Sequence, residues 1–171
     1  LRPADDPDGP PQFAIQRLLA LDSLDIEYVG PYGADWWWHD VRLTHGDVVR
    51  GGGGKTTSAV VAKTSHSTIF GHIHRAEMAS RTLWGKDGPR IITAMSPGCL
   101  TKLGAGEVPA AHHTGQDWQQ ALGWGVMHGG RAILSLLPIQ AGVLAFPDGG
   151  VLVGDSRDAE IAKAIGYPQA G

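Results

Sequence analysis

The alternation of apolar and polar residues predicts a chain of short strands and helices joined by turns. Over residues 13–21 the apolar side chains recur every three or four positions, which predicts a helix. Over residues 24–29 they alternate with acidic residues, which predicts a half-buried strand. Similar patterns and turn residues predict further strands over 36–38, 41–44, 67–70, 77–84, 90–95, 124–128, 131–137, 143–146 and 151–153, and further helices over 55–64 and 156–165.

One strand–helix–strand stretch is expected to bring distant residues together. The strand over 41–44, the helix over 55–64 and the strand over 67–70 together have the size of one βαβ unit. His45 follows the first strand, and His72 follows the second. If these strands are parallel, both histidines lie past the carboxyl edge of one sheet, where α/β proteins place their ligands. The sequence therefore predicts that His45 and His72 are close in space.

Charge and composition narrow the class of protein. The chain has 171 residues, with 14 Lys and Arg against 17 Asp and Glu, and a formal charge of −3. This balance argues against a nucleic-acid or membrane-surface binder, which needs a basic patch. No apolar stretch is long enough for a transmembrane helix, and the single cysteine, Cys99, cannot form an internal disulfide. We therefore expect a cytoplasmic protein with no membrane or nucleic-acid partner.

The domain organisation is simple. Residues 1–11 are acidic and rich in proline, which indicates a linker or disordered lead-in. Residues 12–171 contain no clear internal boundary, and we expect them to form part of a single domain. The chain does not begin with Met, which suggests a piece of something longer.

The Gly-His-Ile-His-Arg string at 71–75 is the strongest candidate for chemistry. In an extended backbone, His72 and His74 would point to the same side, with Cα atoms about 6.5 Å apart. Two imidazoles on one side suit a transition metal. The simpler interpretation is that both histidines only satisfy hydrogen bonds in a loop. The His-Gly-Asp string at 45–47, at the end of another strand, favours the metal.

Three strings in this order resemble those of calcineurin-like metallophosphoesterases: Thr-His-Gly-Asp at 44–47, Gly-His-Ile-His-Arg at 71–75 and Ser-Pro-Gly-Cys-Leu at 96–100. The resemblance covers roughly residues 25–153 and is strongest to the C-terminal half of small bacterial and phage phosphodiesterases. It implies an α/β fold, the layered αββα sandwich of that family. This chain would form its C-terminal portion, with a mixed, strand-rich second half.

The resemblance also implies a site with two divalent metal ions, with Mn²⁺ favoured and Fe or Zn²⁺ as alternatives. Carried over residue by residue, His45 and His72 ligate one metal and His74 ligates the other. The family's remaining ligands are a D-x-H pair, a bridging Asp and an Asn, all of which precede the matched part. This chain contains no Asn. The site would therefore need the missing N-terminal half of the same domain.

The function implied by the resemblance is hydrolysis of a phosphate ester, such as a nucleotide-like phosphodiester, by a metal-activated hydroxide. Two further residues are candidates for catalysis. Arg75 either contacts a phosphate oxygen or is a solvated surface residue. Asp47 is a candidate for holding His45 in its ligating tautomer, as metal-bound histidines usually require.

Two other functions stay open from the sequence. The chain could be a non-catalytic module that keeps the fold as a scaffold or binding surface. It could also bind a nucleotide through the glycine run at 51–54, which is followed by Lys55. The P-loop pattern argues against this, because Val49 stands where its first glycine is required.

Overall fold

The computed structural model describes residues 19–30, 33–101 and 117–154, and its contacts divide the chain into two units, Leu1–Ala34 and Asp35–Gly171. In the first unit, the described residues form a short 3₁₀ helix, η1 (Leu21–Leu24), and an irregular segment after it. The strand expected over 24–29 is wrong. Asp25 has a positive φ of 55°, and the alternating apolar residues that follow are exposed. They pair with no described strand, and a lone strand is not stable.

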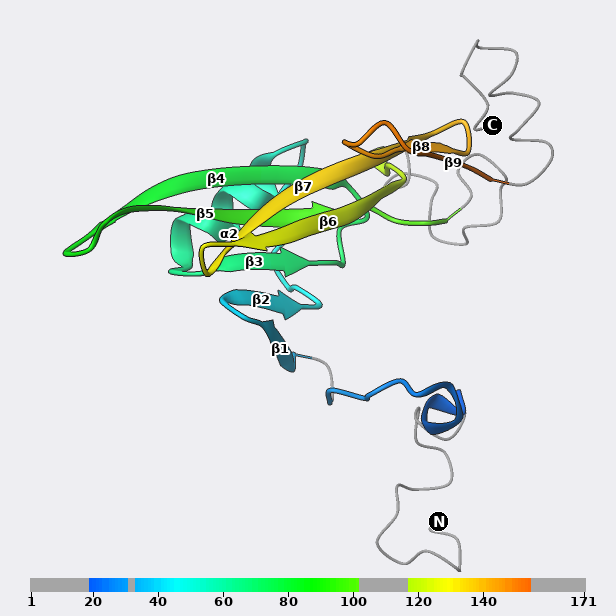
Figure 1. The fold of residues 1–171 in the computed structure, drawn as a ribbon, viewed down its shortest axis with the longest axis horizontal. Coiled ribbons are helices and arrows are strands. Elements are labelled where there is room, and N and C mark those ends of the chain that lie inside the picture. Colours follow the sequence, from blue (N-terminus) through cyan, green and yellow to red (C-terminus); the bar gives the residue numbers. More distant parts are fainter. Residues whose placement is uncertain (1–18, 31–32, 102–116, 155–171) are drawn as a thin grey trace, which may run out of the picture. The chain divides into compact units, whose positions relative to one another are not determined.

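The second unit contains a five-stranded mixed sheet with the strand order β1-β2-β3-β5-β4 (Figure 1). Its strands are β1 (Asp35–Trp38), β2 (Val41–Thr44), β3 (Ser67–Phe70), β4 (Ala76–Gly85) and β5 (Gly88–Pro97). β3 lies parallel between β2 and β5, whereas β1 pairs antiparallel with β2 and β4 antiparallel with β5. All five strands were predicted from the pattern of the sequence, with boundaries that differ by a few residues.

The chain crosses from β2 to β3 through the helix α2 (Lys55–Lys63). β2 and β3 are parallel, and Thr44 pairs with Phe70 at their carboxyl ends. Val61 of α2 packs with Phe70 and Ile92 in a buried apolar cluster on one face of the sheet. The predicted βαβ unit is therefore confirmed, and it sets His45 and His72 at one sheet edge.

Two charged residues of β4 hold the two ends of α2. Glu77 accepts hydrogen bonds from the backbone N–H and the hydroxyl of Thr57, in the first turn of α2, at 3.3 and 3.4 Å. Arg81 donates at 2.6 Å to the backbone oxygen of Thr64, the C-cap. Four residues of a strand and nine residues of a helix both span about 13.5 Å, so the spacing matches the helix. The carboxylate and the guanidinium also complement the helix dipole.

The second sheet is an antiparallel meander of β6 (Ala121–His128), β7 (Arg131–Gln140), β8 (Val143–Ala145) and β9 (Val151–Val153). Gly129 and Gly130 both have positive φ, 56° and 73°, as the tight hairpin turn between β6 and β7 requires. Leu134 of β7 packs with Val41 and Met95 of the first sheet in a second buried cluster. Because side chains alternate along β5, this cluster lies on the face opposite α2.

The expected αββα sandwich is wrong. The described residues contain one α-helix and two sheets, and that helix packs against β3, β4 and β5 of the first sheet. The connections within the second sheet are two to five residues long and leave no room for a helix. The second half is strand-rich, as expected. None of the described helices is both long and apolar enough to cross a membrane.

Some expectations fall on residues outside the described ranges. They are the lead-in over 1–11, most of the helix over 13–21 and all of the helix over 156–165. The boundary between a lead-in and a domain starting at residue 12 therefore stays a prediction.

Candidate metal centre

His45 and His72 lie together at the carboxyl edge of the first sheet. His45 directly follows β2, and His72 follows β3 after one glycine. Their rings meet edge to face with centroids 5.1 Å apart, and Nε2 of His45 lies 3.1 Å from Nδ1 of His72. Both residues are exposed. The predicted proximity of the two histidines is confirmed, and the parallel pairing of β2 and β3 is its cause.

The backbone of the histidine loop, residues 71–75, is tightly turned. His72 has a φ of 69°, and the N–H of Ile73 donates to the oxygen of Gly71 at 2.8 Å, which closes a γ-turn of the rare, positive-φ form. His74 also has a positive φ, 57°. The extended backbone expected over 72–74 is therefore wrong. Ile73 is buried in the cluster under α2 and anchors the turn, while His72 is exposed.

The spacing of the two facing nitrogens suits a pair of ligands on one metal ion. Two nitrogens each about 2.1 Å from an ion are about 3.0 Å apart at a right angle and about 3.4 Å apart at a tetrahedral angle. The 3.1 Å between His45 and His72 falls in this range. As a hydrogen bond, the same contact needs one proton between the nitrogens, so that one donates and the other accepts. The spacing of this pair therefore suits two ligands of one metal ion as well as a hydrogen bond.

His74 has a different environment. Its ring meets that of Trp118 edge to face, with centroids 4.2 Å apart, and its backbone oxygen accepts from the N–H of Gln119 at 3.2 Å. Its Nδ1 is buried without a hydrogen-bond partner among the described residues. In the same part of the chain, no hydrogen bond or ring contact joins His74 to His45 or His72. Its assignment to a second metal stays a prediction.

Close contacts with residues 76, 98 and 99 fix the position of the segment that contains Trp118. Cys99 donates its N–H to the oxygen of Gln119 at 3.0 Å, and Ala76 donates its N–H to the side-chain oxygen of Gln119 at 3.0 Å. Gly98 has a φ of 78°, and a Cβ on it would lie 2.3 Å from the oxygen of Gln119. Only glycine fits there. The Ser-Pro-Gly-Cys-Leu string thus contains the close contact that holds Trp118 beside the histidine loop.

Arg75 is part of a buried ionic network. Its Nε donates to Oε1 of Glu77 at 2.6 Å, and the two side chains are 11% and 3% exposed. Its Nη2 donates to the oxygen of Arg50 at 2.8 Å and to Oγ1 of Thr56 at 3.0 Å. Asp117 adds a carboxylate 3.7 Å from Nε. The solvated surface interpretation of Arg75 is therefore wrong. Its guanidinium ties the histidine loop to the start of α2, and a contact with phosphate stays a prediction.

The other candidate residues stand apart from this network. Asp47 is exposed, and no hydrogen bond or ion pair of its carboxylate occurs within the described ranges. Its role beside His45 stays a prediction. At the end of the glycine run, the N–H of Thr57 is bonded to Glu77. A phosphate at the start of α2 would meet this carboxylate, so the geometry does not favour a nucleotide cradle there.

Sequence reasoning did not single out Glu77 or Trp118. Glu77 stands two residues after Arg75, so their side chains share a face of an extended chain, and this spacing is the signal that could have paired them. Trp118 is far from His74 in the sequence, and no local pattern connects the two. Its position depends on the close contact at Gly98.

Within the described residues, no group of three or more His, Cys, Asp or Glu side chains is arranged to hold a metal ion. Two imidazoles alone fill too few coordination positions for a metal centre. Comparison of the chain with models of protein families, with curated proteins and with solved structures finds no match. The geometry of the histidine pair is therefore the main evidence on function.

Proposed function

We propose that this chain belongs to a metal-dependent phosphoesterase, most simply one that hydrolyses phosphodiesters. The observation that carries the proposal is the pair of facing nitrogens of His45 and His72, 3.1 Å apart at the carboxyl edge of two parallel strands. The sequence strings that contain both residues resemble those of metallophosphoesterases. Imidazole nitrogens suit Zn²⁺ and Fe, and Mn²⁺ is the ion favoured by the resemblance.

In this proposal His45 and His72 hold one divalent ion, and His74 is the ligand for a second. Such ions supply hydroxide near neutral pH and neutralise the phosphoryl oxygens of the substrate. The chain's own contribution is to keep the two imidazoles aligned at the sheet edge. Protons compete with a metal ion for imidazole nitrogens, so metal affinity falls as the pH falls.

The rest of the ligand set has to come from outside the described residues, which supply no third ligand to the pair. We propose the N-terminal half of the same domain as its source. Asp47 remains the candidate for orienting the ring of His45. The substrate we propose is a nucleotide-like phosphate ester, and the proposed location is the cytoplasm.

The metal site is tested by titrating this chain with Mn²⁺, which broadens the NMR signals of nearby nuclei. We expect the strongest broadening at residues 45–47 and 71–75, and its loss in His72→Ala. The matched control is His128→Ala, because His128 is another exposed histidine, at the end of β6, and has no metal-binding neighbour in the described residues. Equal broadening in His72→Ala and the unsubstituted chain would contradict the proposed site.

The reaction is tested by hydrolysis of bis(4-nitrophenyl) phosphate with added Mn²⁺, in the longest natural form of the protein. We expect His72→Ala to lower kcat by at least about 100-fold, since even groups that only orient metal ligands contribute 10–100-fold. His128→Ala should retain the full rate. Metal binding at His45 and His72 without hydrolysis would exclude the phosphoesterase and support a binding module instead.

A further inference from the structure

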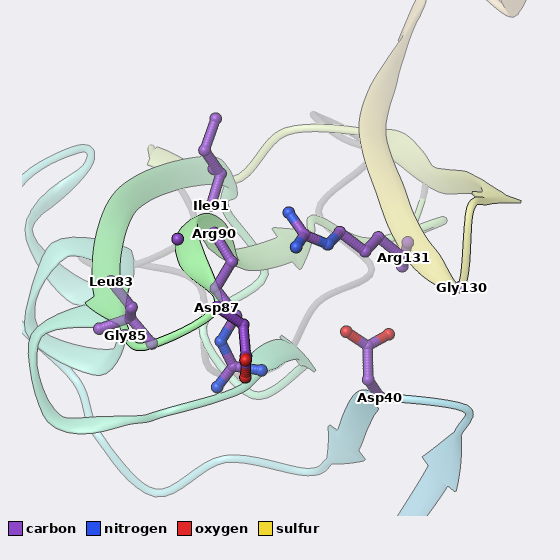
Figure 2. Close-up of a pocket in the computed structure, with 10 residues that line it drawn as sticks. Asp40, Leu83, Gly85, Asp87, Arg90, Ile91, Gly130 and Arg131 are labelled. Atoms are coloured by element: carbon purple, nitrogen blue, oxygen red, sulfur yellow. The ribbon is translucent and has the colours of Figure 1, made fainter.

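A pocket of about 390 Å³ lies at the edge of the first sheet opposite to the histidine pair (Figure 2). It is formed where the β1–β2, β4–β5 and β6–β7 turns meet, with residues from the starts of β5 and β7. The β1–β2 turn precedes β2, whereas His45 follows it, so the pocket and the histidine pair lie at opposite ends of that strand. Its volume is within the range of sites for small molecules.

Four charged side chains line the pocket without neutralising one another: Asp40, Asp87, Arg90 and Arg131. In the described part of the chain, none of them forms an ion pair within 4.0 Å. Figure 2 shows Arg131 reaching from the β6–β7 end toward β5, and the carboxylate of Asp40 directed into the same space. The guanidinium of Arg90 lies beside Asp87 in the same view, so Arg131 is the guanidinium that shares this space with Asp40. A guanidinium in a concave site is a typical ligand of carboxylates and phosphates.

The hydrogen bonds leave most of these polar groups available. Each guanidinium has five N–H donors. Arg131 makes one long bond, 3.4 Å to the oxygen of Pro89, and Arg90 donates to the backbone oxygen of Ser65. Oδ1 of Asp40 is buried and has no partner among the described residues. A buried carboxylate oxygen without a donor is unfavourable, and a hydroxyl group of a ligand would satisfy it.

We propose that this pocket binds a small polyhydroxylated oxyanion, such as a sugar acid or a sugar phosphate. The carboxylate or phosphate would bind the guanidinium of Arg131, and a hydroxyl would donate to Oδ1 of Asp40. Leu83 and Ala132 supply apolar wall for the carbon skeleton. An inorganic anion would satisfy Arg131 only and leave the oxygen of Asp40 without a donor. The site is separate from the proposed metal centre.

Two probes distinguish the sources of the anionic group: D-gluconate carries a carboxylate and D-glucose 6-phosphate carries a phosphate. Both are titrated by NMR with a chelator present, so that anions bound to a metal are not measured. D-sorbitol, which has the hydroxyls alone, and acetate, which has the charge alone, are the controls. We expect at least one probe to shift the amide signals of Asp40, Arg90 and Arg131, and to bind at least about tenfold more tightly than either control.

Two variants test the contributions of the guanidinium and of the carboxylate separately. Arg131→Gln should weaken binding of the probe at least about tenfold, and Asp40→Ala, which removes the acceptor oxygen, should weaken it without weakening acetate. Lys86→Gln is the matched control, because Lys86 is an exposed cation of the β4–β5 turn that does not line the pocket. The proposal is overturned if neither probe shifts these signals, or if the probe binds Arg131→Gln as tightly as the unsubstituted chain. Binding of both probes no tighter than that of sorbitol would overturn it as well.

Discussion

Replacing Glu77 tests the buried ionic network that joins the histidine loop to α2. Glu77 is 5% exposed and accepts hydrogen bonds from Arg75, at 2.6 Å, and from two donors of Thr57. The substitution Glu77→Ala leaves the guanidinium of Arg75 without its nearest counter-charge. It also leaves the backbone N–H of Thr57 without its acceptor, in a helix whose first turn contains no acidic residue.

The size of the effect follows from charge and burial. Two unit charges about 4 Å apart attract by about 4 kcal/mol at an effective dielectric constant of about 20. Arg75 keeps its bonds to Arg50 and Thr56, and the carboxylate of Asp117 stays 3.7 Å from its Nε, so part of its charge remains compensated. We therefore expect Glu77→Ala to lower the free energy of unfolding by about 3 kcal/mol. Glu77→Gln keeps the shape and an acceptor oxygen, and should cost about 1.5 kcal/mol.

The measurement is a double-mutant cycle of Glu77→Ala and Arg75→Met, with unfolding in urea followed by tryptophan fluorescence. We expect a coupling free energy of at least about 1.5 kcal/mol. The matched control is the pair of Asp35 and Arg42, whose charged atoms are 2.9 Å apart but whose side chains are 32% and 38% exposed. That coupling should stay below about 1 kcal/mol. A coupling between Glu77 and Arg75 no larger than the control would refute the argument from burial.

Three further predictions concern pH, backbone fit and metal. The guanidinium of Arg42, with Nε 2.9 Å from Oδ2 of Asp35, lowers the pKa of Asp35 below its usual 3.8. The stabilising effect of this ion pair is complete above that value and is lost as the pH falls through the lowered pKa. The urea midpoints of the unsubstituted chain and Asp35→Asn should therefore converge as the pH falls below about 4. Gly98→Ala should lower the free energy of unfolding by at least about 2 kcal/mol, measured in urea, whereas Gly129→Ala, with a similar φ but open space around it, should cost only about 1 kcal/mol. In the longest natural form of the protein, Mn²⁺ should raise the melting temperature, with reversal by chelator and no effect in His72→Ala, because a ligand that binds only the folded state stabilises it.

The local parts of the fold are the parts that the sequence predicts well. The βαβ unit and the hairpins are predicted by hydrophobic periodicity and by turn residues. Both patterns involve residues that are close together in the sequence. His45 and His72 could be paired because one rule, that parallel strands share a carboxyl edge, connects them. The strand over 24–29 fails because alternation predicts a strand only where a neighbouring strand is available. The αββα sandwich fails because it came from the resemblance and not from the residues.

The faces of β4 could not be read from hydrophobicity. Met78 and Trp84 are 46% and 82% exposed, whereas Glu77 and Arg81 contact the ends of α2. A prediction that buries apolar residues would place Met78 and Trp84 on the inner face of β4 and Glu77 and Arg81 on the outer face, which is the reverse of the structure. The charged residues turn inward because each meets the helix end of opposite partial charge. The inward orientation of Glu77 and Arg81 depends on helix α2, which precedes β4 in the chain. The sequence of β4 alone therefore cannot predict it.

The strain in the histidine loop connects these observations to function. A residue other than glycine at positive φ costs of order 1 kcal/mol or more, and both His72 and His74 adopt such angles. Burial of Ile73 and the ionic network of Arg75 hold the turn against this cost. Glycine would adopt the same turn with less strain, but it would bring no ring to the sheet edge. His39, in the β1–β2 turn, has a similar φ of 53°, so strain alone does not assign a function, and the role of the imidazoles in binding stays a proposal.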